Sequence, residues 1–147
     1  MIYWFTGQPG HGKTVLSLLL KGYLEKTYHK NVIHIDGDDL RAIYENKDYS
    51  KDGRIKNITF AQNLAHFCNV KGFDVVVSLV SPYKEVRDSF KEKLKGQIHE
   101  IYVHTTDIRG REHFHSEDYE RPTENYIDVD TTNIKPNSSL NEIIKNI

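Results

Sequence analysis

The sequence has few of the features that would point to a secreted, membrane or nucleic-acid-binding protein. It contains one cysteine in 147 residues, which excludes an internal disulfide and fits a reducing compartment. It has no apolar run of about 18 residues or more, so no segment reads as a membrane-spanning helix. The formal net charge is −1, so no overall field favours nucleic acid or a membrane surface. The N-terminus lacks a signal-peptide pattern, and we expect a cytoplasmic protein.

Strand-like and helix-like apolar patterns alternate along the chain. The length suits one domain with its own core, so we expect residues 1–147 to form a single domain. Strands are predicted near residues 2–6, 32–35, 74–80, 98–103 and 126–129. Helices are predicted near residues 13–28, 38–46, 55–71, 83–95 and 138–146. This order predicts an α/β fold whose parallel five-stranded sheet carries helices on both faces. Ligands bind such sheets at the carboxyl ends of the strands.

The segment after the first strand has the spacing of a phosphate-binding loop. Residues 7–14 read G-Q-P-G-H-G-K-T and fit G-x-x-x-x-G-K-[ST] at every fixed position. Lys13 is expected to reach the β- and γ-phosphates of ATP, and the Thr14 hydroxyl to bind Mg²⁺. The motif predicts a P-loop NTPase fold with ATP and Mg²⁺ as cofactors. The predicted ATP site consists of Gly7, Gln8, Pro9, Gly10, His11, Gly12, Lys13 and Thr14.

Two carboxylates follow the second strand, in the sequence I-D-G-D-D-L-R of residues 35–41. Of Asp36 and Asp38, one can hold Mg²⁺ through water and the other can accept a proton from an attacking hydroxyl. Arg41 lies about one helical turn further on, where it can clamp a phosphate or sulfate oxygen. The ordinary alternative is a solvated turn with Asp38 as helix N-cap. Beside a phosphate loop we favour catalysis, with which a cap role for Asp38 is compatible.

A second group of polar residues follows, in Y-S-K-D-G-R-I-K-N of residues 49–57. Ser50 fits a helix N-cap, and Arg54 and Asn57 share a helix face because they are three residues apart. A guanidinium beside an amide suits a nucleotide with an anionic tail, and Tyr49 can stack on a base. Taken alone, the segment would be a solvated helix start. The third strand then ends in S-P-Y of residues 81–83, again at the ligand edge.

Together these segments resemble the adenylylsulfate kinase (APS kinase) family, which phosphorylates the 3′-hydroxyl of adenosine 5′-phosphosulfate (APS) with ATP. The resemblance covers nearly the whole chain. The motifs come in the family's order: G-Q-P-G-H-G-K-T, I-D-G-D-D-L-R, Y-S-K-D-G-R-I-K-N-I, S-L-V-S-P-Y-K-E-V-R, E-I-Y-V-H-T and F-H-S-E-D-Y-E-R-P. It implies a P-loop kinase domain, sulfate activation, a small-molecule nucleotide as acceptor and a possible homodimer.

The resemblance also implies roles for individual residues. Asp38 would orient or deprotonate the acceptor hydroxyl, and the catalytic set would be Asp38, Lys13 and Asp36. Thr14 and Asp36 would bind Mg²⁺. Tyr49 stands where the family has a phenylalanine, and Phe114 resembles the aromatic residue on the other side of the acceptor base. The acceptor would be bound by Arg41, Tyr49, Arg54, Asn57, Leu79, Val80, Ser81 and Phe114.

The segment after Thr105 departs from the family pattern. A lysine-bearing K-G-L-Y stretch is absent, so the lid over the reacting phosphates is shortened. Either Arg109 or Arg111 is expected to supply the missing positive charge. His115 and Ser116 replace the small partners in the family's F-T-G segment, which changes the contacts to the acceptor base.

Three functions therefore remain open. The first is an APS kinase with a trimmed lid. The second is the same 3′-hydroxyl transfer to another nucleotide, such as cytidine diphosphoramidate, which the altered residues 114–116 suggest. The third is a nucleotide-binding protein without turnover. The intact Lys13, Thr14, Asp36 and Asp38 argue against the third.

Overall fold

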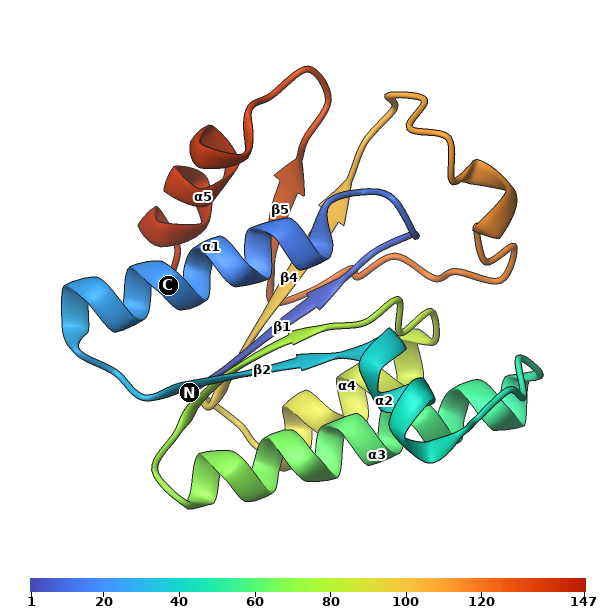
Figure 1. The fold of residues 1–147 in the computed structure, drawn as a ribbon, viewed down its shortest axis with the longest axis horizontal. Helices are drawn as coiled ribbons and strands as arrows, with labels where there is room; N and C mark the ends of the chain where they lie inside the picture. The colour runs from blue at the N-terminus through green and yellow to red at the C-terminus, as the bar shows by residue number, and fades with distance from the viewer.

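The computed structural model describes residues 1–147 as one sheet with helices packed on its two faces (Figure 1). The strands are β1 (Ile2–Thr6), β2 (Val32–Asp36), β3 (Asp74–Ser78), β4 (Ile98–His104) and β5 (Tyr126–Asp130). The helices are α1 (Lys13–Tyr28), α2 (Gly37–Tyr44), α3 (Lys51–Val70), α4 (Lys84–Lys93), α5 (Pro136–Lys145) and a short 3-10 helix, η1 (Glu112–Phe114). None of these helices combines the length and the apolar character that a membrane-spanning segment requires.

The sheet is parallel throughout, with strand order β2-β3-β1-β4-β5. Helices α1 and α5 cover one face, and α3 and α4 cover the other (Figure 1). The prediction of a five-stranded parallel sheet with helices on both faces is confirmed. Every residue of β1 is buried because this central strand has helices above and below it.

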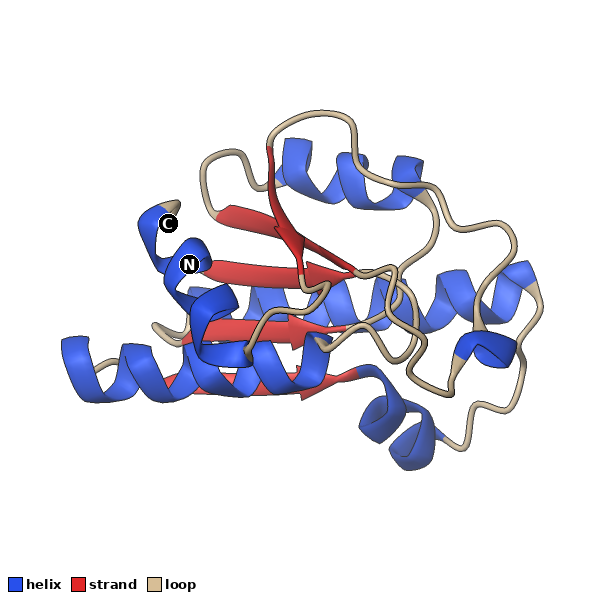
Figure 2. Cartoon of the chain, turned by 90° about the horizontal axis from the view of Figure 1, so that it is seen from above, coloured by secondary structure: helices blue, strands red, loops and turns tan.

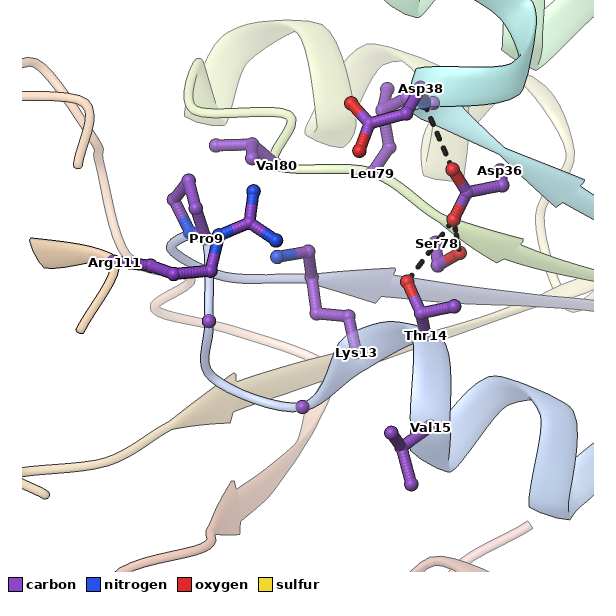
Figure 3. A pocket seen from close by; sticks show the side chains of 13 residues that line it. Pro9, Lys13, Thr14, Val15, Asp36, Asp38, Ser78, Leu79, Val80 and Arg111 are labelled. Carbon is purple, nitrogen blue, oxygen red and sulfur yellow. Dashed lines mark hydrogen bonds between the residues drawn. The ribbon is translucent and has the colours of Figure 1, made fainter. Parts of the chain in front are cut away.

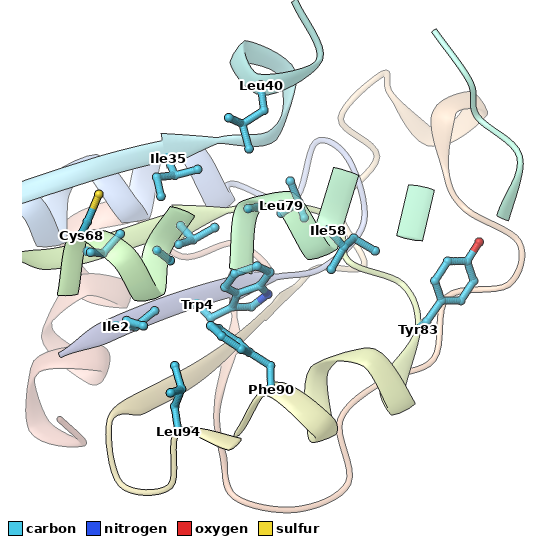
Figure 4. Close-up of a cluster of buried hydrophobic side chains, with 14 residues drawn as sticks. Ile2, Trp4, Ile35, Leu40, Ile58, Cys68, Leu79, Tyr83, Phe90 and Leu94 are labelled. Atoms are coloured by element: carbon cyan, nitrogen blue, oxygen red, sulfur yellow. The ribbon is translucent and has the colours of Figure 1, made fainter. Parts of the chain in front are cut away.

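The alternation of side chains along β1 supplies both cores. Trp4 points to the α3 and α4 side, where its ring meets that of Phe90 edge-on at a centroid distance of 5.5 Å (Figure 4). Phe5 points to the other side and packs with Leu16 and Leu20 of α1. Each such buried side chain contributes roughly 1.5–3 kcal/mol to folding. These two cores fix the sheet edge from which the functional loops leave.

The carboxyl ends of the strands all point toward the edge where α2, η1 and the long loops gather (Figure 2). From β1 the chain enters α1 on one face, whereas from the neighbouring β3 it enters α4 on the other face. Loops that leave adjacent strands in opposite directions open a crevice between them, and this is where ligands bind in such sheets. The phosphate-binding loop follows β1 directly.

Two of the boundaries that differ from the sequence prediction have a clear local cause. Helix α3 begins at Lys51 rather than near residue 55, because the Ser50 hydroxyl caps it and accepts from the Gly53 N–H at 3.3 Å. Strand β3 ends at Ser78 rather than near residue 80. Ser81 has φ = 46°, in the left-handed region, which no extended strand can accommodate.

The N-cap of α2 is Asp36, not Asp38. The Asp36 side chain accepts from the backbone N–H of Asp38 at 3.0 Å, and Asp38 lies in the first turn of the helix. The alternative that gave Asp38 the capping role is therefore wrong. The side chain of Asp38 therefore does not cap the helix.

Candidate functional site

Two adjoining cavities lie along the carboxyl edge of the sheet. The first has a volume of about 320 Å³ and the second about 510 Å³. They share six lining residues and so form two parts of one crevice: Pro9, Gly37, Asp38, Leu79, Val80 and Arg111. Asp38 and Arg111 are the two charged residues at the junction.

The phosphate-binding loop lines the first cavity (Figure 3). Gly7 has φ = 146°, and a Cβ there would lie 2.1 Å from the carbonyl oxygen of Val103. Gly10 has φ = 81°, and a Cβ there would lie 3.0 Å from the Cβ of Arg111. These two close approaches, to β4 and to the lid segment, explain why the loop needs glycine at both positions.

Lys13 is the buried cation of the first cavity. Its Nζ donates to the carbonyl oxygen of Gln8 at 2.8 Å. The pKa of Lys13 is lowered to about 8, mainly by burial, with the carboxylates of Asp38 and Asp36 opposing the shift and Arg111 adding to it. An ammonium held in this way gains a favourable partner when a polyphosphate enters the cavity.

Three residues of the predicted ATP site, Gly7, Gln8 and His11, do not line the cavity. The Gln8 amide forms two hydrogen bonds with the backbone of Ser116. Its Nε2 donates to the Ser116 carbonyl at 2.8 Å, and its Oε1 accepts from the Ser116 N–H at 2.8 Å. The His11 ring packs edge-on against His115, with the ring centroids 5.0 Å apart. These side chains attach the phosphate-binding loop to the segment that follows η1.

We expect His11 to make the protein less stable in acid. Burial, followed by the nearby His115 and Lys13, lowers the pKa of His11 to about 4, and its Nδ1 has no hydrogen-bond partner. The unfolded chain binds this proton from about pH 6.5, so stability is lost as the pH falls from there toward 4, by up to roughly 3 kcal/mol. Urea unfolding at pH 7 and pH 4.5 measures the loss.

The control for this prediction is His11→Asn, which should lose clearly less stability between the two pH values. Burial also lowers the pKa of His34 and His99, but both are present in either protein and cancel in the comparison. An equal loss in the two proteins would contradict the prediction.

Asp36 joins three elements at the floor of the first cavity (Figure 3). Its Oδ2 accepts from the Thr14 hydroxyl at 3.1 Å and from the Ser78 hydroxyl at 2.8 Å. Its Oδ1 accepts from the Asp38 N–H. The carboxylate thereby fixes α1, β3 and α2 relative to one another. Asp38, by contrast, makes no side-chain hydrogen bond and presents its carboxylate to the junction of the cavities.

The structure distinguishes between the two lid arginines. Arg111 lines both cavities, and its guanidinium lies beside Lys13 and Pro9 (Figure 3). Arg109 donates to the Thr131 carbonyl at 2.9 Å and to Asp107 at 3.3 Å, and lines neither cavity. Arg111 is therefore the lid cation that faces the site.

The second cavity combines cations with exposed aromatic rings. The Arg41 guanidinium lies 4.1 Å from the centroid of the Tyr49 ring. Arg54 donates to the Ser116 hydroxyl at 2.8 Å and to Asp118 at 3.2 Å. The Phe114 side chain is 59% exposed. All eight residues predicted for the acceptor site line this cavity: Arg41, Tyr49, Arg54, Asn57, Leu79, Val80, Ser81 and Phe114.

Several residues that line the two cavities were not predicted from the sequence. Ser78 pairs with Asp36 in the register of β3 with β2, so both stand at the same height of the sheet edge. A Cβ at Gly37 would lie 2.3 Å from Leu79 Cδ1, which shows how closely α2 approaches β3. Identifying either residue needs the strand order, which the sequence does not supply. Other lining residues not predicted are Val15, Ile58 and His113, whereas Pro82 belongs to the S-P-Y segment that was expected at this edge.

Comparison with known proteins gives consistent matches. The sequence model of the adenylylsulphate kinase family matches residues 1–130. The cytidine diphosphoramidate kinase of Campylobacter jejuni is 32% identical over 143 residues, which cover 95% of this chain and 83% of that protein. A probable adenylyl-sulfate kinase of Pyrococcus abyssi is 34% identical over 102 residues, or 69% of this chain. This chain spans 58% of the length of that archaeal protein.

The fold is also found among solved structures. The APS kinase of Mycobacterium tuberculosis in complex with AMPPNP and APS superimposes with a TM-score of 0.81 at 22% identity. The match covers 98% of this chain and 95% of that one. At this identity the likeness is one of fold.

Proposed function

Because the chain belongs to the adenylylsulphate kinase family, and is therefore a kinase-type phosphotransferase, we propose that it transfers the γ-phosphoryl group of ATP to the 3′-hydroxyl of a nucleotide with an anionic tail. One observation carries the proposal: the phosphate-loop cavity and the arginine-lined cavity meet at Asp38 and Arg111. In this proposal residues 1–147 act as one kinase domain. The homodimer that the resemblance implies stays a prediction.

The first cavity is the proposed ATP site. Backbone N–H groups of Gly10, Gly12, Lys13 and Thr14, which line this cavity, surround the phosphates, and the Lys13 side chain binds the β- and γ-phosphate oxygens. The Thr14 hydroxyl and the Asp36 carboxylate, with Oγ1 and Oδ2 3.1 Å apart, provide the hard oxygen donors that suit Mg²⁺. Two protein ligands are enough, because Mg²⁺ keeps several waters and binds substrate phosphates as well. When bound, Mg²⁺ neutralises charge on the phosphates.

The second cavity is the proposed acceptor site. Arg41, Arg54 and Asn57 bind the anionic tail, and the rings of Tyr49 and Phe114 stack on the base. Leu79, Val80 and Ser81 line this cavity as well, and the first two also line the ATP cavity. Asp38 orients the acceptor 3′-hydroxyl and accepts its proton late in an in-line transfer.

The first candidate acceptor is APS. The family model and the adenylyl-sulfate kinase relatives support it, and so does the cationic lining of the second cavity. In this case the protein would serve sulfate activation, and the shortened lid would still cover the phosphates.

The second candidate acceptor is cytidine diphosphoramidate. Similarity to the Campylobacter enzyme extends over 95% of this chain and so includes the lid segment, whereas similarity to the Pyrococcus protein covers 69%. The lining residues His113, His115 and Ser116 belong to the part of the chain that departs from the APS kinase pattern. This observation favours an acceptor whose base differs from adenine.

The test is ADP release with Mg·ATP against a panel of acceptors, with APS and cytidine diphosphoramidate compared at equal concentration. We expect release to depend on the acceptor and to prefer one of the two by at least tenfold. Preference for APS would assign the chain to sulfate activation, and preference for the cytidine compound would assign it to the second function. ATP binding without release on any nucleotide would overturn the proposal and leave a binding protein.

A further inference from the structure

A chain of hydrogen bonds connects Asp36, at the floor of the first cavity, with buried polar groups between β2 and α1. The Ser78 hydroxyl that donates to Asp36 lies 2.9 Å from Nε2 of His34. The same Nε2 lies 3.0 Å from the Ser17 hydroxyl, which donates to the carbonyl oxygen of Thr14 at 2.9 Å. Because the Thr14 hydroxyl itself donates to Asp36, the chain closes into a ring.

Counting protons fixes the direction of these bonds. Each serine hydroxyl has one proton, and Ser78 and Ser17 give theirs to Asp36 and to the Thr14 carbonyl. Both hydroxyl oxygens must therefore accept from His34, whose Nε2 carries the shared proton. With His34 as the donor, the Ser78 proton has only the Asp36 carboxylate to point at. The ring is satisfied in a single arrangement.

The fold places these groups together from three distant segments. His34 and Asp36 are two residues apart in β2 and so face the same side of the sheet, the side covered by α1. Ser78 is the β3 neighbour of Asp36, and Ser17 lies on the buried stripe of α1. Ser17 and Ser78 are 0% and 3% exposed, so their hydroxyls have little contact with water and depend on these protein partners.

We infer that His34 and Ser78 are positioning residues, which hold the Asp36 carboxylate in the orientation that binds Mg²⁺ with ATP. This inference rests on the proposed function of the first cavity. Asp36 accepts two hydrogen bonds at Oδ2 and one at Oδ1, so its rotation is fixed from three sides. Removing the Ser78 bond, or the histidine that directs it, frees the carboxylate to turn. Removing a side chain that hydrogen-bonds to a metal ligand commonly lowers the metal affinity 10- to 100-fold.

The test compares Ser78→Ala, His34→Leu and the double variant by binding, without any acceptor. Electron paramagnetic resonance of Mn²⁺ in the presence of AMPPNP measures the metal affinity. Binding of AMPPNP without metal measures the nucleotide affinity of the phosphate-binding loop. We expect each single variant to bind Mn²⁺ at least about tenfold more weakly, with less than about threefold change in metal-free binding. Because both residues act through one bond, the double variant should be no weaker than Ser78→Ala.

Two further variants separate positioning from general damage. His34→Gln keeps an N–H near the position of Nε2 and should bind Mn²⁺ within about threefold of the unaltered protein. His99→Leu removes another half-buried strand histidine, one that stacks on Tyr3, and should leave Mn²⁺ binding unchanged.

Two results would overturn the inference: unchanged Mn²⁺ affinity in both single variants, or losses that multiply in the double variant. Thermal unfolding of each variant identifies a loss that comes from misfolding, and Ser78→Ala, the smallest change, then decides the question. Failure of the unaltered protein to bind Mn²⁺ with AMPPNP would instead refute the proposed ATP site itself. The two failures are thus distinguishable.

Discussion

Replacing Asp38 by alanine is expected to lower the rate of phosphoryl transfer by about 10² or more while ATP binding survives. The carboxylate of Asp38 is exposed to the crevice and makes no side-chain hydrogen bond. Its removal therefore breaks no structural contact, because the bond to Asp36 comes from the backbone N–H and remains. What is lost is the group that orients the acceptor hydroxyl.

Single-turnover formation of ADP, with an acceptor that the panel identifies, measures this effect, and equilibrium binding of AMPPNP checks the ATP site. Asp39→Ala is the matched control, since Asp39 is the adjacent exposed carboxylate in the same turn of α2 and lines neither cavity. It should retain most of the activity. Turnover near that of the unaltered protein in Asp38→Ala would remove Asp38 from the catalytic role.

A second large effect is expected at Arg111, where alanine should lower kcat by about 10² to 10³. The guanidinium lies beside Lys13 at the junction of the cavities. In the proposed reaction, this is where negative charge develops on the transferred phosphoryl group. Because this interaction strengthens in the transition state, kcat should fall far more than the affinity for ATP. Steady-state kinetics with ATP as the varied substrate separates the two.

Arg109→Ala is the contrast from the same segment. Its guanidinium is tied to the Thr131 carbonyl and to Asp107, so we expect less than about a tenfold change in kcat. A larger loss for Arg109→Ala than for Arg111→Ala would reverse the assignment of the lid cation.

The features that the sequence predicted are those encoded by neighbouring residues. The loop of residues 7–14 is recognisable because its glycines, Lys13 and Thr14 act within eight positions. The strand and helix ranges follow from local apolar patterns, and the Ser50 cap from its residue type. Among the lining residues, Asp38 and Ser81 were expected because each closely follows a strand, whereas Arg54 was assigned to the acceptor site through the family resemblance.

The features that the sequence did not predict depend on contacts across the sheet. The neighbours of Asp36 at Ser78 and Thr14 come from strand register and from the docking of α1, which no local pattern encodes. The distinction between Arg109 and Arg111 depends on the path of the lid, since they are only two positions apart in sequence but only Arg111 faces the cavities. The capping role of Asp36 was missed for a simpler reason, because both acids of D-G-D are good caps.

The paired hydrogen bonds between Gln8 and residue 116 have a consequence for how such a kinase changes its substrate. Gln8 bonds to the main chain of Ser116, not to its side chain, so the attachment is independent of which residue occupies that position. Side chains at 113–116 can then be exchanged while the lid stays fastened to the ATP site. If the proposed function holds, substrate preference and catalytic competence are separable, because this short segment can change its side chains without altering the ATP site.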